Sequence, residues 1–501
     1  MKTAYFPILL ILRTIIVLYL SAFPYRLWSI GWEEAQRDIE KSLEYLQLDQ
    51  AEIQAGNISH KSYQLFYKSN ILIYKFLATY SPTYYQALKK SWTETIEAIE
   101  EMPDTDSMRN ILLAELYYKR GALEFFMENY FTSVRYIQNS RSLIRKNEQK
   151  FPGLQEHKKI NGLFNVAFGA VPRKYQWLTN FLGFSGDIQV GVSLLKEAAE
   201  QSKLLPMEAE LMAYYVAKNM QDQPRKAIGR LLKVKNRMED NIVLDLCLAS
   251  GYMGIKENEK ALSFLTKRDV YQLNPSVFFI PHWDYLLGKA YYFKQDYPNA
   301  QLCFSHFLKS NGGNPFRTDA TFRLGMAFTL DGNYPKGLEF FKALASDKSS
   351  GFDEDEYADH QAQRFSRLEP TKTIKALFSA RNLFDGGYYI QALSILDSLA
   401  KQPLNISDKT ELYYRYARVF HTQGKLDKAS TAYHICIKQT KSEQLWLQVY
   451  AHYFLAEIAL EQRKTDEARS FYKKALTFDD YFYQDGLENR CKIALAELEN
   501  N

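Results

Sequence analysis

Hydrophobic and polar residues follow the period of an amphipathic helix along most of this chain, rather than the two-residue period of a strand. Segments such as IEKSLEYLQLDQAEI (39–53) and NILIYKFLATY (70–80) space their apolar residues three and four positions apart, which places them on one helix face. Helix breakers are scarce, with 23 Gly and 15 Pro in 501 residues. The pattern predicts an all-α protein that is helical almost throughout after Trp32.

A pattern of small residues recurs from about residue 210 onward. In its clearest copy, Gly288 is followed twelve positions later by Ala300 and four further on by Phe304. Other copies begin at Tyr215, Ala249, Gly325, Ala380, Ala417 and Ala456, and a less regular one at Gly121. Two antiparallel helices approach closely only where both carry small side chains, and a large residue then fills the groove beside them. The spacing predicts a stack of helix hairpins.

These positions resemble the tetratricopeptide repeat (TPR), whose copies are about 34 residues long. The Trp of that repeat is mostly absent here, and most copies lack its proline after the second helix. The resemblance implies a superhelical solenoid of antiparallel helix hairpins, in which the first helix of each hairpin lines a concave face.

The longest interval between copies contains an insertion at 346–370. Its acidic residues are Asp353, Glu354, Asp355, Glu356 and Asp359. The insertion lacks the glycine and the terminal glutamate of a calcium-binding loop. We expect a solvated loop, with a short helix within it left open.

A second resemblance lies in residues 162–198. The positions that carry it are Gly162, Phe164, Pro172, Gly183, Phe184, Gly186, Asp187 and Gly191. They resemble a signature of the eukaryotic inclusion-body clearance family, which includes outer-mitochondrial-membrane TPR proteins. The resemblance implies an all-helical scaffold without known catalysis, associated with lipid droplets and mitochondrial outer membranes, although Ile188 stands where that family usually has arginine.

The residues of this segment themselves predict a tight turn at 183–186 that leads into a helix. Asp187 stands where its side chain would cap the first amides of that helix. The alternative is an anion held on the same amides, which the carboxylate of Asp187 would repel.

The N-terminus is apolar at 4–12 and 14–24, with Arg13 between the two blocks. As one membrane span, the stretch would place an arginine near its centre, at a cost of about 2.5–3.5 kcal/mol. As a signal peptide, it would be cleaved after the small residues Ser21-Ala22. A hydrophobic first helix of the array is the third interpretation. We expect 1–24 to be a signal peptide or membrane anchor, in a chain that is exported or membrane-tethered (periplasmic or extracytoplasmic if bacterial) rather than cytoplasmic.

Three regions follow from these observations. After residues 1–24, a helical repeat region at 25–205 contains the GFSGD signature, and a TPR array with the inserted loop occupies 206–501. No stretch rich in Pro, Gly or Ser separates the last two.

Charge and motifs point away from catalysis. The chain has 63 Lys and Arg against 58 Asp and Glu, a net charge of +5 without a concentrated basic stretch, so we expect no nucleic-acid partner. Its four cysteines are widely separated, and its eight histidines form no zinc-ligand motif. No nucleotide-binding loop or nucleophile motif occurs. The sequence therefore predicts a protein that is not an enzyme, with no cofactor and no metal.

What remains is a binding surface. Residues of the first helices that point away from the small packing positions are expected to contact a partner: Tyr285, Lys289, Tyr292, Arg381, Tyr414, Arg418, His421 and Tyr453. Aromatic rings interleaved with Lys and Arg favour an extended protein or peptide segment with acidic groups. The alternative for the tyrosines is simple packing. The alternative function is a membrane- or lipid-associated factor, tethered by the N-terminal apolar segment.

Overall fold

The computed structural model describes residues 33–170, 185–221, 223–267, 278, 280–310, 316–344, 353–440 and 444–500. In these ranges the secondary structure consists of helices and turns, with no strand, which confirms the all-α prediction. The expected signal peptide or anchor at 1–24 lies outside the described residues, as do Pro172, Gly183 and Phe184.

The chain forms two compact units. Of the described residues, those within 33–255 and 260–283 and residue 310 belong to unit 1, and those within 256–259, 284–309 and 316–500 belong to unit 2. The region boundary expected near residue 205 falls within unit 1, between helices α10 and α11, which contact each other.

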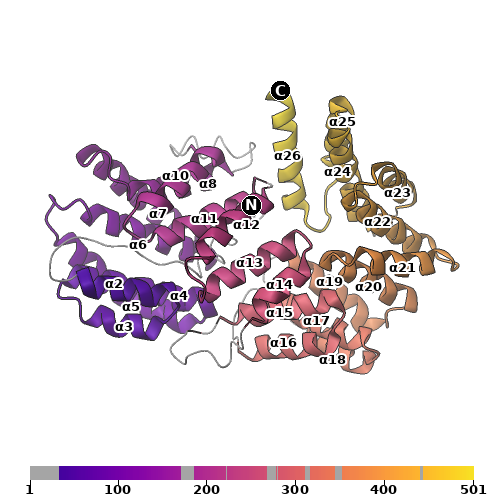
Figure 1. Ribbon diagram of the computed structural model, residues 1–501, viewed down its shortest axis with the longest axis horizontal. Coiled ribbons are helices and arrows are strands. Elements are labelled where there is room, and N and C mark those ends of the chain that lie inside the picture. The colour runs from indigo at the N-terminus through magenta and orange to yellow at the C-terminus, as the bar shows by residue number, and fades with distance from the viewer. Residues whose placement is uncertain are drawn as a thin grey trace. The chain divides into compact units, whose positions relative to one another are not determined.

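Unit 1 is a succession of antiparallel helices (Figure 1). Its helices are α2 (Glu33–Glu44), α3 (Leu48–Gly56), α4 (Lys61–Thr79), α5 (Pro82–Glu100), α6 (Arg109–Phe126), α7 (Tyr130–Lys150), α8 (His157–Gly169), α10 (Ile188–Gln201), α11 (Pro206–Asn219), α12 (Pro224–Lys235) and α13 (Ile242–Gly254), followed by most of α14 (Asn258–Leu265). Neighbours in the chain pack on one another, as in α4 with α5, α6 with α7, and α8 with α10.

Unit 2 repeats the same arrangement. Its helices are α15 (His282–Lys294), α16 (Tyr297–Lys309), α17 (Arg317–Leu330), α18 (Tyr334–Leu344), α19 (Asp353–Arg367), α20 (Lys372–Gly386), α21 (Tyr389–Ala400), α22 (Ile406–Thr422), α23 (Leu426–Gln439), α24 (Leu445–Glu461), α25 (Thr465–Ala475) and α26 (Gln484–Asn500). The first helices of successive hairpins also lie beside one another, as α20, α22 and α24 do.

The hairpins close at the small residues that the sequence pattern singled out. A Cβ added at Gly288 would come within 2.9 Å of the Phe304 ring, and one at Gly325 within 2.7 Å of the Phe341 ring. In the later copies Ala380, Ala417 and Ala456 are buried, each in one core cluster with the small and the large residue of its own copy. The register of the repeats is therefore confirmed, and each hairpin is held at the distance that its small residues allow.

The irregular copy in the first half follows the same rule. A Cβ at Gly121 would lie 2.9 Å from Ile137, and the Ser133 hydroxyl donates a hydrogen bond of 2.8 Å to the Gly121 carbonyl. Helices α6 and α7 thus approach as closely as the TPR-like hairpins of unit 2.

The signature segment brings α8 and α10 together backbone to backbone. A Cβ at Gly162 would lie 2.9 Å from the Gly191 carbonyl oxygen, and one at Gly191 would lie 2.7 Å from the Gly162 oxygen. The Asp187 carboxylate accepts a hydrogen bond of 2.9 Å from the Val190 amide at the start of α10. The cap expected at Asp187 is confirmed, and the glycines serve close packing.

The insertion at 346–370 contains a longer helix than a solvated loop suggests. Helix α19 packs against α17 and α18, and Phe365 lies buried among their rings. The Asp355 carboxylate accepts hydrogen bonds from the amides of Phe316 (3.3 Å) and Asp319 (2.7 Å), at the first turn of α17. One acidic residue of the insertion therefore caps a neighbouring helix.

Two further observations bear on function. No helix in the described part of the chain is long and apolar enough to cross a membrane. The four cysteines are buried and not joined in disulfides.

Candidate partner-binding surfaces

Three of the tyrosines expected on the binding face are covered by other side chains. Tyr285, Tyr292 and Tyr414 are only 1–2% exposed. The Tyr285 ring stacks on Phe316 with centroids 5.0 Å apart, and the Tyr414 ring meets Trp446 edge to face at 5.6 Å. These rings are therefore packed beneath the surface rather than exposed on it.

The groups stacked on such rings are cations, and they form a row along the first helices of unit 2. The Lys289 ammonium lies 5.2 Å from the Tyr285 ring centre, and the Arg323 guanidinium lies 5.7 Å from that of Tyr292. Both cations are partly exposed. Cation–π attraction holds each charge on an aromatic face.

The row continues over α20, α22 and α24. The Arg418 guanidinium lies between two rings, 3.9 Å from the centre of Phe454 and 5.2 Å from that of Phe384. Lys256 approaches the Phe384 ring to 4.1 Å. We call Lys289, Arg323, Arg381 and Arg418, with the rings beneath them, the cation–aromatic row.

Carboxylates neutralise only part of this row. Arg323 Nε lies 2.5 Å from Asp319 Oδ2, and Arg381 Nε lies 3.7 Å from Asp385 Oδ2. Asp385 also pairs with Lys256 at 3.0 Å. Among the residues that the structure describes, no carboxylate forms an ion pair with Lys289 or Arg418.

The pKa values in the row reflect this imbalance. Burial and the nearby Arg323 lower the pKa of Lys289. Burial would raise the pKa of Asp385, but Lys256 and Arg381 lower it to about 2. The row therefore carries an excess of positive charge.

His421 and Tyr453, the other two expected site residues, lie beside the row. His421 Nε2 is 3.3 Å from Glu461 Oε1, and its ring meets Phe454 edge to face. Burial lowers the pKa of His421, against the effect of Glu461. Tyr453 packs on Tyr472 and Phe454. Both side chains are partly exposed and support the rings on which Arg418 lies.

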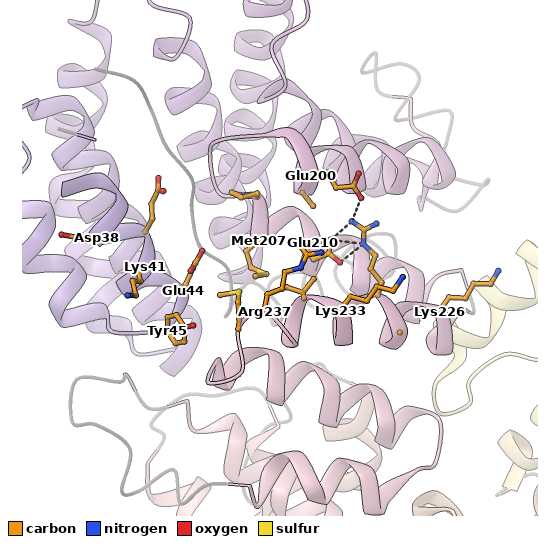
Figure 2. Close-up of a pocket in the computed structure, with 17 residues that line it drawn as sticks. Asp38, Lys41, Glu44, Tyr45, Glu200, Met207, Glu210, Lys226, Lys233 and Arg237 are labelled. Carbon is orange, nitrogen blue, oxygen red and sulfur yellow. Dashed lines mark hydrogen bonds and ion pairs between the residues drawn. The ribbon is translucent and has the colours of Figure 1, made fainter. Parts of the chain in front are cut away.

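A second surface lies in unit 1, as a cleft of about 1210 Å³ between α2 and α10–α12 (Figure 2). One wall is basic, because Lys226, Arg230, Lys233 and Arg237 share a face of α12 and the turn after it. The opposite wall carries Asp38, Lys41 and Glu44 of α2, and Tyr45 in the turn after it.

Arg230 is the most firmly held side chain of this cleft. Its guanidinium donates to both carboxylate oxygens of Glu210, at 2.7 and 2.6 Å, and pairs with Glu200 at 3.3 Å, the contacts dashed in Figure 2. Burial raises the pKa of Glu44 to about 7. Acids and bases are equally numerous in the lining, so the cleft favours no ligand of a single charge.

Comparison with known families identifies the repeat. A family model described as "Tetratricopeptide repeat" matches residues 285–352 and 446–481. The matched segments include the copies at Gly288, Gly325 and Ala456. These two segments are similar to tetratricopeptide repeats. No curated protein sequence matches the chain.

Solved TPR structures resemble the chain at low identity. The yeast Tom70 structure and the APC/C hetero-tetramer Cut9–Hcn1 are each 13% identical, cover 93% of this chain and 96% of that chain, and have TM-scores of 0.23. The P58(IPK) TPR domain is 15% identical, covers 94% of this chain and 100% of that chain, and has a TM-score of 0.21. At such scores the superpositions agree over part of their length only, so the repeat assignment rests on the family match and the hairpin contacts.

The sequence pattern located Lys289, Arg381 and Arg418 but missed Arg323, and it missed the carboxylates Asp319 and Asp385 that pair with Arg323 and Arg381. It also missed the unit 1 cleft, although the spacing of Lys226, Arg230 and Lys233 on one helix face was a readable signal. In the described part of the chain, no three His, Cys, Asp or Glu side chains gather as a metal site would require.

Proposed function

We propose that this TPR protein is a non-catalytic scaffold that binds an extended acidic segment of a protein partner along the cation–aromatic row. The observation that carries the proposal is the pair of cations, Lys289 and Arg418, that lie on aromatic rings without an ion-paired carboxylate in the described residues. A buried or half-buried cation without an anion costs free energy, and a carboxylate of the partner would recover it.

The geometry favours an extended segment over a compact ligand. Lys289 lies on α15 and Arg418 on α22, with α17, α19 and α20 between them in the chain. A peptide that reaches both cations must therefore contact side chains of at least two first helices. Rings at each step offer apolar contact, so acidic residues spaced by apolar or aromatic ones suit the row.

Selection from a displayed library of random peptides tests this proposal. Wild-type protein should enrich sequences rich in Asp and Glu, and the double variant K289M/R418M should lose that enrichment. The matched control is Lys428→Met. It removes a cation from α23, the second helix of its hairpin, where the Lys428 ammonium lies 5.9 Å from the centre of the Phe420 ring. Enrichment without acidic bias, or equal enrichment by the double variant, would overturn the proposal.

Location is a separate proposal. We propose that residues 1–24 direct export or tether the chain to a membrane, which the apolar blocks on either side of Arg13 support. If the chain is tethered to a membrane, we further propose a lipid-associated role and membership of the inclusion-body clearance family. The intact mass of the mature protein from fractionated cells tests this: loss of about the first 22 residues means a cleaved signal, full length in the membrane pellet means an anchor, and full length in the cytosol contradicts both.

A further inference from the structure

The turn between α25 and α26 breaks the contact rule of a repeat array. In such arrays each repeat contacts only its neighbours, and α25 and α26 accordingly pack on each other. Residues 481–483, however, extend back to α19. The Phe482 ring lies 5.6 Å from that of Tyr357 and 5.0 Å from that of His360. The helices from α20 to α25 separate these partners in the chain.

Tyr483 makes the second half of this contact. Its ring lies 6.0 Å from that of Tyr357, whose hydroxyl accepts a hydrogen bond of 2.7 Å from Arg381 Nη1. The Arg381 guanidinium in turn lies 4.9 Å from the centre of the Tyr357 ring. The C-terminal turn therefore lies beside the ring that holds Arg381, the cation of the row that comes between Lys289 and Arg418 in the sequence.

The backbone of the turn is held in an uncommon conformation. Asp480 and Tyr483, both non-glycine residues, have φ values of +62°. Left-handed conformations of such residues persist where surrounding contacts fix them. The ring contacts of Phe482 and Tyr483 supply that fixation.

The sequence of the turn has the chemistry that the row is expected to bind. Asp479 and Asp480 are exposed and precede three aromatic residues, Tyr481, Phe482 and Tyr483. We propose that this segment is a built-in competitor: it covers Tyr357, the ring on which Arg381 of the row lies, and a partner segment with acidic residues beside adjacent aromatics displaces it. This inference rests on the proposed function and adds the class of partner and a means of regulation.

The test uses a labelled peptide of residues 477–485 (TFDDYFYQD) against the full chain. The opened variant is F482A/Y483G, because glycine adopts the positive φ of position 483 without strain while the ring is lost. A tethered segment acts at an effective concentration on the order of 1 mM. For a peptide whose Kd at the vacant site is about 100 µM, competition by the tethered segment weakens the apparent affinity of the free peptide about tenfold. The peptide should therefore bind the opened variant about tenfold more tightly than wild type.

Controls separate this inference from the proposed function. A peptide with alanine at the positions of Tyr481, Phe482 and Tyr483 should lose binding to the opened variant, and Tyr357→Leu in that background should lose it too. If the double variant melts early, Phe482→Ser alone should give a smaller gain in the same direction. Equal affinity of wild type and opened variants overturns the competitor, whereas acidic peptides from the library that still require Lys289 and Arg418 leave the proposed function standing.

Discussion

Each unit of the chain buries cations on helices, but they are neutralised differently. In unit 1, Lys119 and Lys159 each pair with both Glu115 and Glu208, at 2.7–3.0 Å, and all four side chains are at most 2% exposed. In unit 2, Lys289 and Arg418 lie on rings and are partly exposed, without an ion pair in the described residues. In the first group, which we call the closed group, two positive charges are matched by two negative ones. The second group, Lys289 and Arg418, is left with a positive excess, and we call it the open group.

This difference indicates that the charged group of unit 1 has a structural role, whereas that of unit 2 is a candidate for binding. The unit 1 network joins α6, α8 and α11. Tyr74 adds α4 to it, because its hydroxyl donates a hydrogen bond to Glu208. No place remains in it for an outside charge, so its role is to fix four helices together. We propose that the row of unit 2 contributes less to folding and that its donors bind a partner.

Breaking the closed group should have the largest effect. Lys159→Met leaves two buried carboxylates with a single ammonium, which is expected to cost about 3–5 kcal/mol of unfolding free energy. Urea unfolding of unit 1, followed by circular dichroism, measures the loss. Lys289→Met is the control from the open group and should cost less than about 1 kcal/mol; equal losses would erase the distinction between the two groups.

The closed group should also set the stability of unit 1 in acid. Burial would raise the pKa of Glu115, but Lys159 and Lys119 lower it to about 2. Because the folded pKa lies below the unfolded value of 4.5, this stabilisation is present above pH 4.5 and is lost as pH falls towards 2. Urea unfolding between pH 6 and 2 should show the decline in wild type and a shallower one in Glu115→Gln. Parallel curves would contradict the lowered pKa.

A smaller effect comes from the hairpin contact that carries the row. Gly288→Trp places a ring where a Cβ already lies 2.9 Å from Phe304, and overpacking of this kind costs about 1–3 kcal/mol or more. The matched control is Gly229→Trp, since nothing lies within 4 Å of a Cβ there. Thermal melting should fall for the first variant only, and unchanged melting of Gly288→Trp would refute the repeat register.

The smallest expected effect lies at a helix end. Asp187→Ala removes the cap of the Val190 amide and should cost about 1 kcal/mol. Asp187→Asn retains an acceptor and should cost less. Chemical denaturation of the two variants gives the comparison, and equal losses would mean that the cap does not act through its hydrogen bond.

The sequence predicted the hairpins because their signal is local. Gly288, Ala300 and Phe304 lie within seventeen residues of one another, and small residues at that spacing are typical of closely packed hairpins in a helical chain. Lys289, Arg381 and Arg418 were named for the same reason, since their places follow from the hairpin register, whereas Arg323 was not.

What the sequence did not reveal depends on contacts between distant segments. Glu115 and Glu208 lie on α6 and α11, and nothing in their local sequence indicates that they share two lysines. The burial of Tyr285 follows from Phe316 beyond the next helix. The seat of Phe482 on Tyr357 joins residues more than a hundred positions apart.

The affinity of an acidic library-selected peptide for wild type and for K289M/R418M tests the central claim most directly. Each lost charge-assisted contact is worth about 1.5–3 kcal/mol, so the account predicts at least about a hundredfold weaker binding with unchanged melting. Equal affinities, or the same loss in Lys428→Met, would contradict the view that unit 2 carries a row of cations awaiting a partner's carboxylates.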